Sequence, residues 1–489
     1  MGQAHCNASD RSKPESSLLM PPLMHGTLPL TARLEPWMTE LVENPKLCQE
    51  LLTKYGSPLN VHNFSSMARN ITELREAAAE YEVDFQIYLA RKANKTLGAI
   101  DKAFAEGCGV DVASFHELDQ CLKRGISSDS LIVTAAVKSQ ALLELAVQNN
   151  VVLSLDNEDE VDDLLQIANA TNTPARVALR LASADPQIPP TRFGLSAERW
   201  LEFLGGVTNQ KALEVIGVHF HLNGYDGGQR AAVLQESLDL VDALRQQGHS
   251  VKFVDMGGGI PMSYLDDSIQ WRGFWEALAE LPEGDESLTW KADRLGATGP
   301  QASKALYPYH QQLIRGPWLE QILTTKGADG SQSVAEMLNE RGIQLRCEPG
   351  RSLLDGCGLT LSQVAFTKER SDGVSLVGLH MNRTQCRSTA ADFLVDPLLV
   401  KTAGRHSRQL APYSGFLVGA YCIEEELILR RRFEFPQGVA KGDIVAFPNT
   451  GGYLMHIIES ASHQLPLAKN LKWDDGQWDL DGIDEIRLG

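Results

Sequence analysis

Several residues capable of covalent or acid–base chemistry follow short apolar runs of the sequence. Lys92 comes directly after the run 85–91, FQIYLAR, and precedes a helix-like segment that begins at residue 96. A lysine amine can form a Schiff base with a carbonyl compound. A lysine in a solvated turn is the more ordinary arrangement, so the function of Lys92 depends on which residues lie near it.

Two further runs lead into residues that bind anions. The run 251–256 is followed by three consecutive glycines at 257–259, and the run 343–348 is followed by Arg351 in CEPGRSL. Glycines leave backbone N–H groups accessible to an anion, and an arginine adds a charge-assisted, bidentate contact. A glycine run alone is usually turn chemistry. Its combination with an arginine after the next run predicts a phosphate site.

These residues would meet if the apolar runs were the strands of one barrel. Eight such runs alternate with amphipathic segments, which predicts a (β/α)8 TIM-like barrel, with a doubly wound sheet as the second choice. In such a barrel the carboxyl ends of the strands form the active site. The eight runs are 85–91, 109–114, 131–136, 151–156, 176–181, 214–222, 251–256 and 343–348.

The rhythm of strand and helix changes after residue 353, where strand-like runs follow one another with little helix between them. This predicts a second, mostly β domain. The connection 257–342 is too long for one helix and loop, and we expect it to be a lid, a pocket wall or an interface. The expected organisation is a disordered segment at 1–30, a lead-in at 31–64 with a strand that joins the β domain, the barrel at 65–353 and the β domain at 354–489.

Charge and composition exclude some classes of partner. The 489 residues include 63 acidic and 45 basic side chains, and the net charge of −18 argues against nucleic acid as a partner. No run approaches eighteen apolar residues, so no membrane span is expected, and the first residues lack the plan of a secretory signal. The eight cysteines form no CxxC motif. Reduced thiols in the cytoplasm are therefore expected.

A phosphate site, a lysine at a strand end and a carboxylate near the phosphate arginine together indicate pyridoxal 5'-phosphate (PLP). Glu348 could keep the pyridine nitrogen of PLP protonated, which makes the ring a better electron sink. A flat side chain such as His221 could cover the ring. A hydrogen-bonded core histidine is the alternative for His219 and His221. We expect no metal, since no third ligand accompanies these two histidines.

Seven motifs, in this order and spacing, resemble the fold-type III PLP-dependent decarboxylases, the family of diaminopimelate, ornithine and biosynthetic arginine decarboxylases. The resemblance covers about residues 57–465, and the long form, with ARKANK and FLVDPLLV, is most similar to the Y4yA-like branch. It implies a cytoplasmic homodimer with shared active sites and a small amino-acid-like substrate. The motifs are ARKAN, VDVASFHEL, HFHLNGY, DMGGGIP, CEPGRSL, GAYCIEEE and GGYLMH.

The resemblance also implies roles for individual residues. Lys92 would hold the cofactor as a Schiff base, His221 would stack on it, and Glu348 would bond its pyridine nitrogen. Cys422 of the partner subunit would protonate the carbanion that remains after carbon dioxide leaves. The other implied contacts are Asp111 near the lysine, Arg180 near the cofactor, Arg192 on a mobile loop, and Gly257, Gly258, Gly259, Arg351 and Tyr453 at the phosphate.

The sequence departs from the family pattern at two places. Asn223 and Gly224 stand where the family has Gly-Ser, so one phosphate hydroxyl lacks its counterpart. Ile423 replaces the acidic residue that usually follows the catalytic cysteine, and it cannot accept a hydrogen bond from a distal ammonium. We therefore predict that ornithine, lysine and arginine are not substrates, and that a larger or acidic amino acid, or a conjugate, is. Loose candidates for substrate contacts are Arg387, Asp392 and Glu424.

The leading hypothesis is removal of the α-carboxylate of an amino acid or amino-acid conjugate. A racemase on the same barrel is an alternative, but related alanine racemases place an arginine where this sequence has Glu348. A non-catalytic regulator of such an enzyme is a second alternative. The presence of Lys92, Glu348 and Cys422 argues against it.

Overall fold

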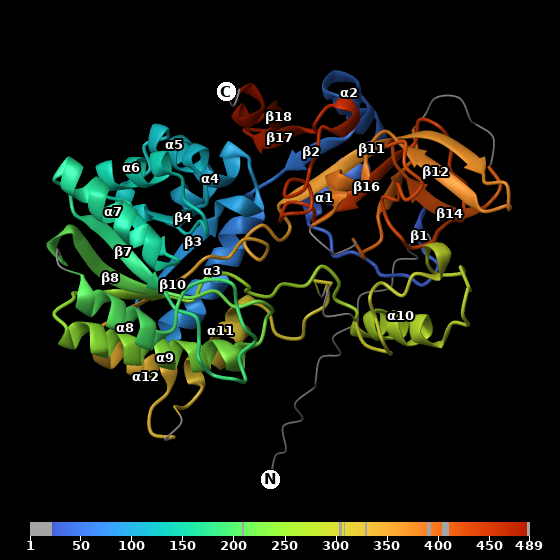
Figure 1. Cartoon of the computed structure of the whole chain (residues 1–489). Coiled ribbons are helices and arrows are strands. Elements are labelled where there is room, and N and C mark those ends of the chain that lie inside the picture. The colour runs from blue at the N-terminus through green and yellow to red at the C-terminus, as the bar shows by residue number, and fades with distance from the viewer. Residues whose placement is uncertain are drawn as a thin grey trace, which may run out of the picture.

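The structure, a computed structural model, describes residues 22–207, 210–302, 306–307, 309–327, 330–388, 393–402 and 410–486. Figure 1 shows a helix-ringed barrel beside a domain built on a large twisted sheet. Most of the segment expected to be disordered, 1–21, lies outside the described residues.

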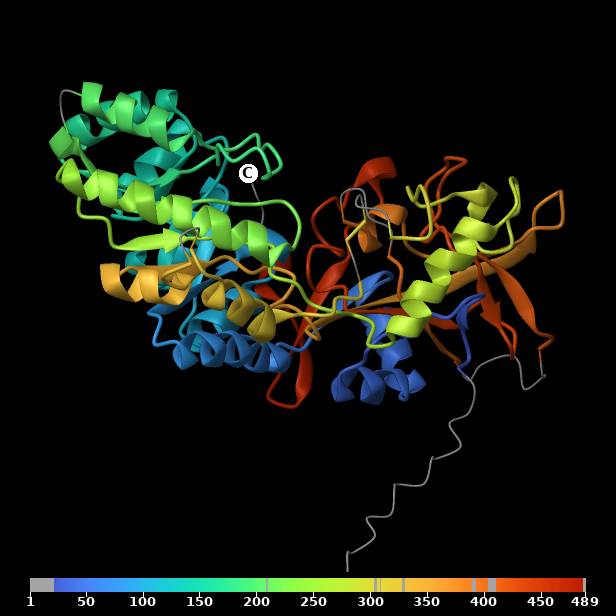
Figure 2. The same ribbon diagram turned by 90° about the horizontal axis from the view of Figure 1, so that it is seen from below.

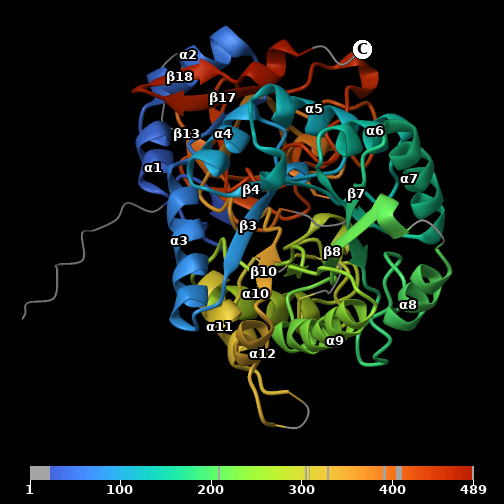
Figure 3. The same cartoon turned by 90° about the vertical axis from the view of Figure 1, so that its left-hand side faces the viewer.

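Eight parallel strands form a closed barrel, in which β10 pairs with both β9 and β3. The predicted (β/α)8 fold is therefore confirmed, and each strand falls on one of the eight apolar runs. Figure 3 looks at the barrel with its helices around it. The strands are β3 (Phe85–Ala90), β4 (Gly109–Val112), β5 (Leu131–Val133), β6 (Val152–Leu155), β7 (Ala175–Arg180), β8 (Leu213–His219), β9 (Phe253–Asp255) and β10 (Gln344–Cys347).

The barrel helices begin at side chains suited to capping. Ser114, Ser139, Asn157 and Ser196 each accept a hydrogen bond from a backbone N–H in the first turn of the helix that follows. Such caps satisfy N–H groups that have no partner within the helix. The helices are α3 (Ser65–Glu80), α4 (Leu97–Ala105), α5 (Phe115–Lys123), α6 (Gln140–Gln148), α7 (Glu158–Thr171), α8 (Ala197–Gly206), α9 (Gly227–Gln246), α11 (Arg315–Thr324) and α12 (Val334–Arg341).

The interior of the barrel is filled. Six strands contribute one buried side chain each to a separate apolar cluster, and the guanidinium of Arg346 lies 3.7 Å from the ring centroid of Phe253 in that cluster. The members are Tyr88, Ile132, Val152, Ala178, Ile216 and Phe253. Polar side chains at the carboxyl ends of the strands therefore rest on a packed floor rather than on a channel.

The second domain is a ten-stranded sheet in the order β1-β15-β14-β12-β11-β2-β17-β18, with β16 joining β11 to β13. Strand β2 (Leu59–His62) precedes the barrel in sequence and lies between β11 and β17. The remaining elements are β1 (His25–Gly26), α1 (Pro36–Val42), α2 (Pro45–Tyr55), β11 (Gly358–Glu369), β12 (Ser375–Leu379), β13 (Leu398–Val400), β14 (Tyr413–Val418), β15 (Phe433–Phe435), β16 (Ile444–Pro448), β17 (Lys469–Asp474) and β18 (Gln477–Leu480).

Residues 22–30 differ from the expected disorder. Strand β1 pairs with β15, and Met24 and Leu30 are buried in the core of the β domain. Leu23 and Leu28 pack against the same core, and the N–H of Leu30 donates to Asp396 at 3.0 Å, so this apolar stretch is ordered by side-chain burial as well as by hydrogen bonds.

The long connection between β9 and β10 leaves the barrel and returns to it. Its helix α10 (Ser268–Glu280) packs on the β domain and lies far from the barrel helices, as Figure 2 shows. Trp275 is buried in the core of the β domain and Trp271 packs edge-on against it. The connection therefore completes the second domain. Neither tryptophan is among the residues that line the cavity at the end of the barrel, whereas Tyr307 of the same connection is, so the connection also provides part of a pocket wall.

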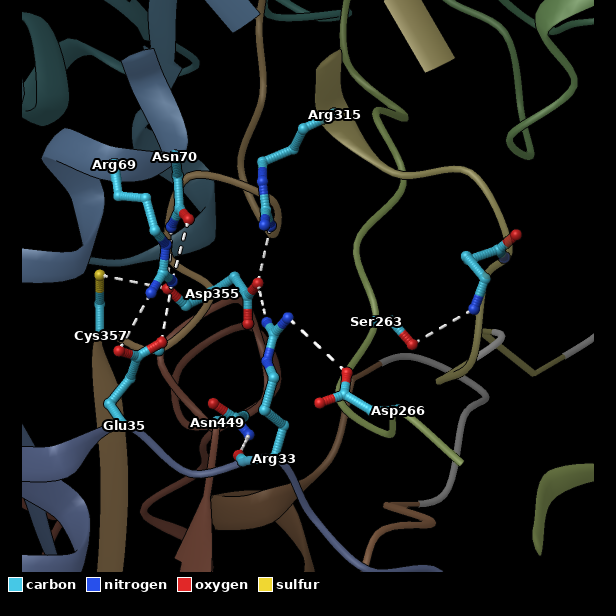
Figure 4. A network of polar contacts seen from close by, with 12 residues as sticks. Arg33, Glu35, Arg69, Asn70, Ser263, Asp266, Arg315, Asp355, Cys357 and Asn449 are labelled. Atoms are coloured by element: carbon cyan, nitrogen blue, oxygen red, sulfur yellow. Dashed lines mark hydrogen bonds and ion pairs between the residues drawn. The ribbon is translucent and has the colours of Figure 1, made fainter. Parts of the chain in front are cut away.

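Paired charges hold the two domains together where the connection, α3 and the lead-in meet (Figure 4). Asp355, fully buried, accepts hydrogen bonds from Arg33 and from Arg315, the latter at 2.7 Å. Arg315 also donates to Glu73 of α3. We call Arg33, Glu73, Arg315 and Asp355 the junction cluster. It ties the barrel to the segment that enters the β domain.

Candidate active site

Lys92 lies one turn beyond β3, at the carboxyl end of the barrel. Its Nζ donates a hydrogen bond of 2.6 Å to Asp111 Oδ2 and lies 4.0 Å from Glu348 Oε2. Thr134, at the end of β5, donates to the other oxygen of Asp111. Burial alone would lower the pKa of Lys92, but Asp111 and Glu348 raise it above its usual value. The turn lysine is therefore a site residue held in place by two carboxylates.

Glu348 belongs to a buried cluster of titratable groups. Its Oε1 lies 3.7 Å from His219 Nε2, and neither atom has a hydrogen-bond partner in the described residues. His219 Nδ1 is bonded to Ser154 Oγ at 2.6 Å. Burial, with Asp111 and Asp255 nearby, raises the pKa of Glu348 well above its ordinary value. Burial and Arg180 lower the pKa of His219, so this histidine is neutral.

The same cluster has the spacing of a metal-ligand set, which the sequence did not indicate. Ligand atoms of His219, Asp255 and Glu348 all lie within 4.8 Å of one another. Burial raises the pKa of Asp255 to about 6 and that of Glu348 well above its usual range. Protons on these carboxyl groups can therefore balance the charge that a cation would otherwise balance.

His221 faces the cavity above this cluster. It lies beyond the end of β8, so it does not share the environment of His219, although the two are only two residues apart. Its Nδ1 accepts a hydrogen bond of 3.2 Å from the N–H of Gly258. Burial, with Lys92 nearby, lowers the pKa of His221 to about 3. The ring is neutral and available to lie against a flat ligand.

The glycines at 257–259 let neighbouring backbone and side-chain atoms lie close to the main chain. Gly257 and Gly259 have φ values of 66° and 77°, which favour glycine, and a Cβ at Gly258 would lie 2.9 Å from the carbonyl oxygen of Glu348. The N–H of Gly257 donates to Asp255 Oδ1 at 2.9 Å, and that of Gly258 is used by His221. Gly259 lines the cavity.

Arg180 ends β7, which is separated by β8 from the strand that the glycines follow. Its Nη1 donates to Asp156 Oδ1 at 3.1 Å, and its guanidinium lies 4.1 Å from the centroid of the Phe193 ring. Arg192 lies at the same distance from that ring. Phe193 in turn meets His221 edge-on at 6.5 Å. The loop that carries Arg192 therefore connects Arg180 to the histidine through an aromatic contact.

The β domain completes the cavity. The N–H of Tyr453 donates to the carbonyl oxygen of Ala93 at 2.7 Å, and Asn94 Nδ2 donates to that of Gly451 at 2.9 Å. Arg351 Nη1 donates to the carbonyl oxygen of Gly452 at 3.2 Å. The ARKAN motif thus joins both domains. The cavity, of about 90 Å³, is lined by His221, Leu222, Asn223, Gly224, Tyr225, Gly259, Ile260, Tyr307, Gly350, Arg351 and Tyr453.

The remaining candidates for substrate contacts and proton donation are Cys422, Glu424, Arg387 and Asp392. Cys422 is exposed on the loop 419–426 of the β domain with Glu424, and no hydrogen bond or ion pair joins either to Lys92 among the described residues. Arg387 is held by its backbone N–H to Leu454, beside Tyr453 in sequence. Asp392 lies outside the described residues.

The arrangement fits PLP on two observations. Glu348 Oε1 is a buried acceptor without a hydrogen-bond partner in the described residues, and it lies 3.7 Å from Nε2 of the neutral His219. The other oxygen of the same carboxylate lies 4.0 Å from Lys92 Nζ. A Cβ at Gly350 would lie 2.7 Å from Tyr453 Oη, so only glycine keeps the phosphate end of the cavity open. Lys92, Glu348 and the residues around Arg351 could therefore hold the aldehyde, the ring nitrogen and the phosphate.

This closed barrel with its mostly β second domain has the architecture of fold type III. The family model of the pyridoxal-dependent decarboxylases, pyridoxal binding domain, matches residues 66–281. A protein of Sinorhizobium fredii named Uncharacterized protein y4yA is 30% identical over 86% of this chain and 90% of its own length. The chain therefore belongs to the fold-type III PLP-dependent decarboxylase family, as the motifs predicted.

Two further comparisons agree with this assignment. The diaminopimelate decarboxylase of Zymomonas mobilis is 23% identical and covers 83% of this chain and 85% of its own length. The crystal structure of a diaminopimelate decarboxylase mutant from Helicobacter pylori, complexed with L-lysine, has the same fold. Its TM-score is 0.66 at 18% identity, with 89% of this chain and 97% of that chain covered.

Several site residues had no clear signal in the sequence. Thr134 stands at the end of an apolar run, which could have marked it as a neighbour of Asp111. Ser154 is in the interior of β6, and Arg230 lies within α9 with no motif around it. Tyr225 ends the HFHLNGY motif and could have been considered with it.

Proposed function

We propose that the protein is a PLP-dependent decarboxylase that removes the α-carboxylate of an amino acid or amino-acid conjugate. The observation that carries the proposal is the arrangement of Lys92, bonded to Asp111, beside the unpartnered carboxylate oxygen of Glu348. When bound, PLP would supply an electron sink for the electron pair left by departing carbon dioxide.

The residues of the chain have separate tasks in this proposal. Asp111, at 2.6 Å, orients the Lys92 amine and can accept the proton that the amine must lose before it acts as a nucleophile. Glu348, whose raised pKa lets it carry a proton, would hold that proton at the ring nitrogen. His221, being neutral, would cover the ring without adding charge. Glu348 also separates this site from a racemase, which would favour a weaker sink.

A spectrum and a gas measurement test the proposal. Protein saturated with PLP should show the absorption band of lysine-bound cofactor near the visible edge, and borohydride reduction should attach the cofactor to Lys92. A screen of amino acids and amino-acid conjugates should then find one that releases carbon dioxide. Absence of the band would indicate the non-catalytic regulator. A band with substrate inversion and no carbon dioxide would indicate the racemase.

We further propose that two chains share each active site. Cys422 is exposed and makes no polar contact with its own Lys92 site in the described chain, so the proton donor would be the partner subunit's Cys422. Mixing Lys92→Ala with Cys422→Ala chains should restore about a quarter of native activity, because half the dimers are mixed and each has one intact site. Exchange of subunits without recovery would contradict sharing.

The substrate proposal rests on the loop that carries Cys422. Ile423 is 43% exposed on this loop, where an acceptor for a distal ammonium would be needed. We therefore propose that ornithine, lysine and arginine are poor substrates and that a larger or acidic amino acid, or a conjugate, is preferred. Glu424 is exposed on the same loop and is the competing acceptor. Turnover of any of the three free amino acids at ordinary decarboxylase efficiency would refute this.

In the part of the chain that the structure describes, no helix combines the length and apolar character needed to cross a membrane.

A further inference from the structure

A buried arginine fixes the loop that follows His221, residues 222–226, through hydrogen bonds to backbone carbonyl oxygens. Arg230, in the first turn of α9, is fully buried. Its Nη2 donates to the carbonyl oxygens of Leu222, Gly224 and Gly258 at 3.3, 2.8 and 3.1 Å. One guanidinium therefore fixes this loop against the glycine run that forms the other wall of the cavity.

A tryptophan of α11 provides a second anchor. Trp318 Nε1 donates to the carbonyl oxygen of Tyr225 at 2.7 Å, and the Arg230 guanidinium lies 5.2 Å from the centroid of the Trp318 ring. Asp226 accepts a hydrogen bond from the N–H of Gln229 and so begins α9. Tyr225 is thus fixed on both sides by contacts that do not involve its hydroxyl.

The side chain of Tyr225 lines the cavity together with Arg351. Among the described residues, no hydrogen bond joins its hydroxyl to another group. Burial raises the pKa of Tyr225 to about 12, although Arg351 lowers it in part, so the phenol keeps its proton at neutral pH and can donate. Asn223 and Gly224 line the same wall and have no hydroxyl.

We propose that the Tyr225 hydroxyl is a ligand of the cofactor phosphate, and that Arg230 is the positioning residue that holds its loop. The inference rests on the proposed function, since the phosphate is that of PLP. Tyr225 would supply the hydroxyl that Asn223 and Gly224 lack, and Arg351 would supply the charge. Tyr307 is a less suitable donor, because it presents its ring face to Arg351 at 4.4 Å and is 37% exposed.

The test compares PLP with pyridoxal, which lacks the phosphate. Dissociation constants of both compounds are measured by titrating the full-length apoprotein and following absorbance or quenching of tryptophan fluorescence. Tyr225→Phe should weaken PLP binding about tenfold, as expected for one hydrogen bond to a charged group, and change pyridoxal binding less than about twofold. Tyr81→Phe is the matched control, because Tyr81 follows α3 and is not among the residues that line the cavity, and it should change both constants less than about twofold.

Arg230→Lys tests the positioning role, because a lysine keeps the charge but cannot contact three carbonyl oxygens in a planar fork. It should weaken PLP binding about three- to tenfold and leave pyridoxal binding and the far-ultraviolet circular dichroism unchanged. Arg230→Met should weaken PLP binding at least as much if it folds.

Two results would overturn the inference alone. One is native PLP affinity in Tyr225→Phe, and the other is an equal loss of PLP and pyridoxal affinity in that variant. A wild-type protein that binds neither compound would instead overturn the proposed function, and this inference with it.

Discussion

The carboxyl end of the barrel and the junction cluster both bury charged side chains, but they balance those charges differently. At the junction, Asp355 accepts from two arginines, and one of them is also paired with Glu73. At the barrel end, Glu348 Oε1 and His219 Nε2 are buried and have no partner in the described chain. Asp355 Oδ1 is also buried without a hydrogen-bond partner in the described residues, but its carboxylate is paired with two arginines. Glu348 is instead paired with Lys92, at 4.0 Å, and Lys92 is also bonded to Asp111.

This difference separates a structural cluster from a binding site. A buried polar atom without a partner costs free energy, so it needs an explanation, and completion by a ligand is one such explanation. The barrel end is also where the pKa values of two carboxyl groups, Asp255 and Glu348, are raised by burial. Buried carboxyl groups with raised pKa values are typical of functional sites. Changes at the two clusters should therefore affect different properties.

The largest effect is expected at Lys92. Lys92→Ala removes the amine that would bond the cofactor, so activity should fall by about 10³-fold or more, and the absorption band of bound cofactor should shift to that of free PLP. The free energy of unfolding of the apoprotein should also fall, because the substitution leaves the buried Asp111 without its ion-pair partner. A variant that keeps the band would show that another lysine is the attachment site.

A loss of stability alone is expected at the junction. Asp355→Ala leaves Arg315, whose side chain is 3% exposed, without its buried partner. The free energy of unfolding, measured by urea denaturation, should fall by about 3 to 5 kcal/mol. Asp266→Ala is the control: it removes an exposed carboxylate 4.0 Å from Arg33 and should change stability little. Loss of PLP binding in folded Asp355→Ala would show that the two clusters are not independent.

Measuring the free energy of unfolding against pH should distinguish the two clusters further, because Asp255 at the barrel end has a raised pKa. Burial raises its pKa from 3.8 to about 6 in the folded protein. The unfolded chain loses its proton first as pH rises, so the stability present at about pH 3 is lost by about pH 7. The loss should be about 3 kcal/mol in the apoprotein. Asp255→Asn still accepts from Gly257 and should lack this loss. Parallel curves for both proteins would refute the assignment.

The smallest of these effects is expected at Glu348. Glu348→Gln keeps the size of the side chain but cannot hold an additional proton at the ring nitrogen, so kcat should fall about 100-fold with little change in PLP affinity. Stopped-flow absorbance separates the chemical step from binding. Unchanged kcat would remove Glu348 from the proposed chemistry and reopen the racemase alternative.

The local pattern of the sequence was sufficient for the barrel. Its eight apolar runs became eight strands, and Lys92, Asp111 and Glu348, chosen because they follow or end such runs, meet at one end of the barrel. This works because parallel strands in a closed barrel all end at the same face. The motif resemblance identified the family from the same residues.

The sequence predicted one distant pairing, that of a lead-in strand with the β domain, but not the other long-range packing. It gave no sign that α10 leaves the barrel for the core of the β domain, or that Met24 and Leu30 are buried there. An apolar helix face is compatible with many partners, and only the shape of the whole molecule selects one.

What the sequence determined by itself is therefore the order of strands and helices, the residues at the strand ends and the family. The tertiary structure decided which polar groups are paired. It placed His219 and His221 in different environments, and it held Tyr225 beside Arg351 through Arg230 and Trp318. The physical reason is that runs and spacings are local properties, whereas burial and charge compensation depend on residues that are far apart in the chain.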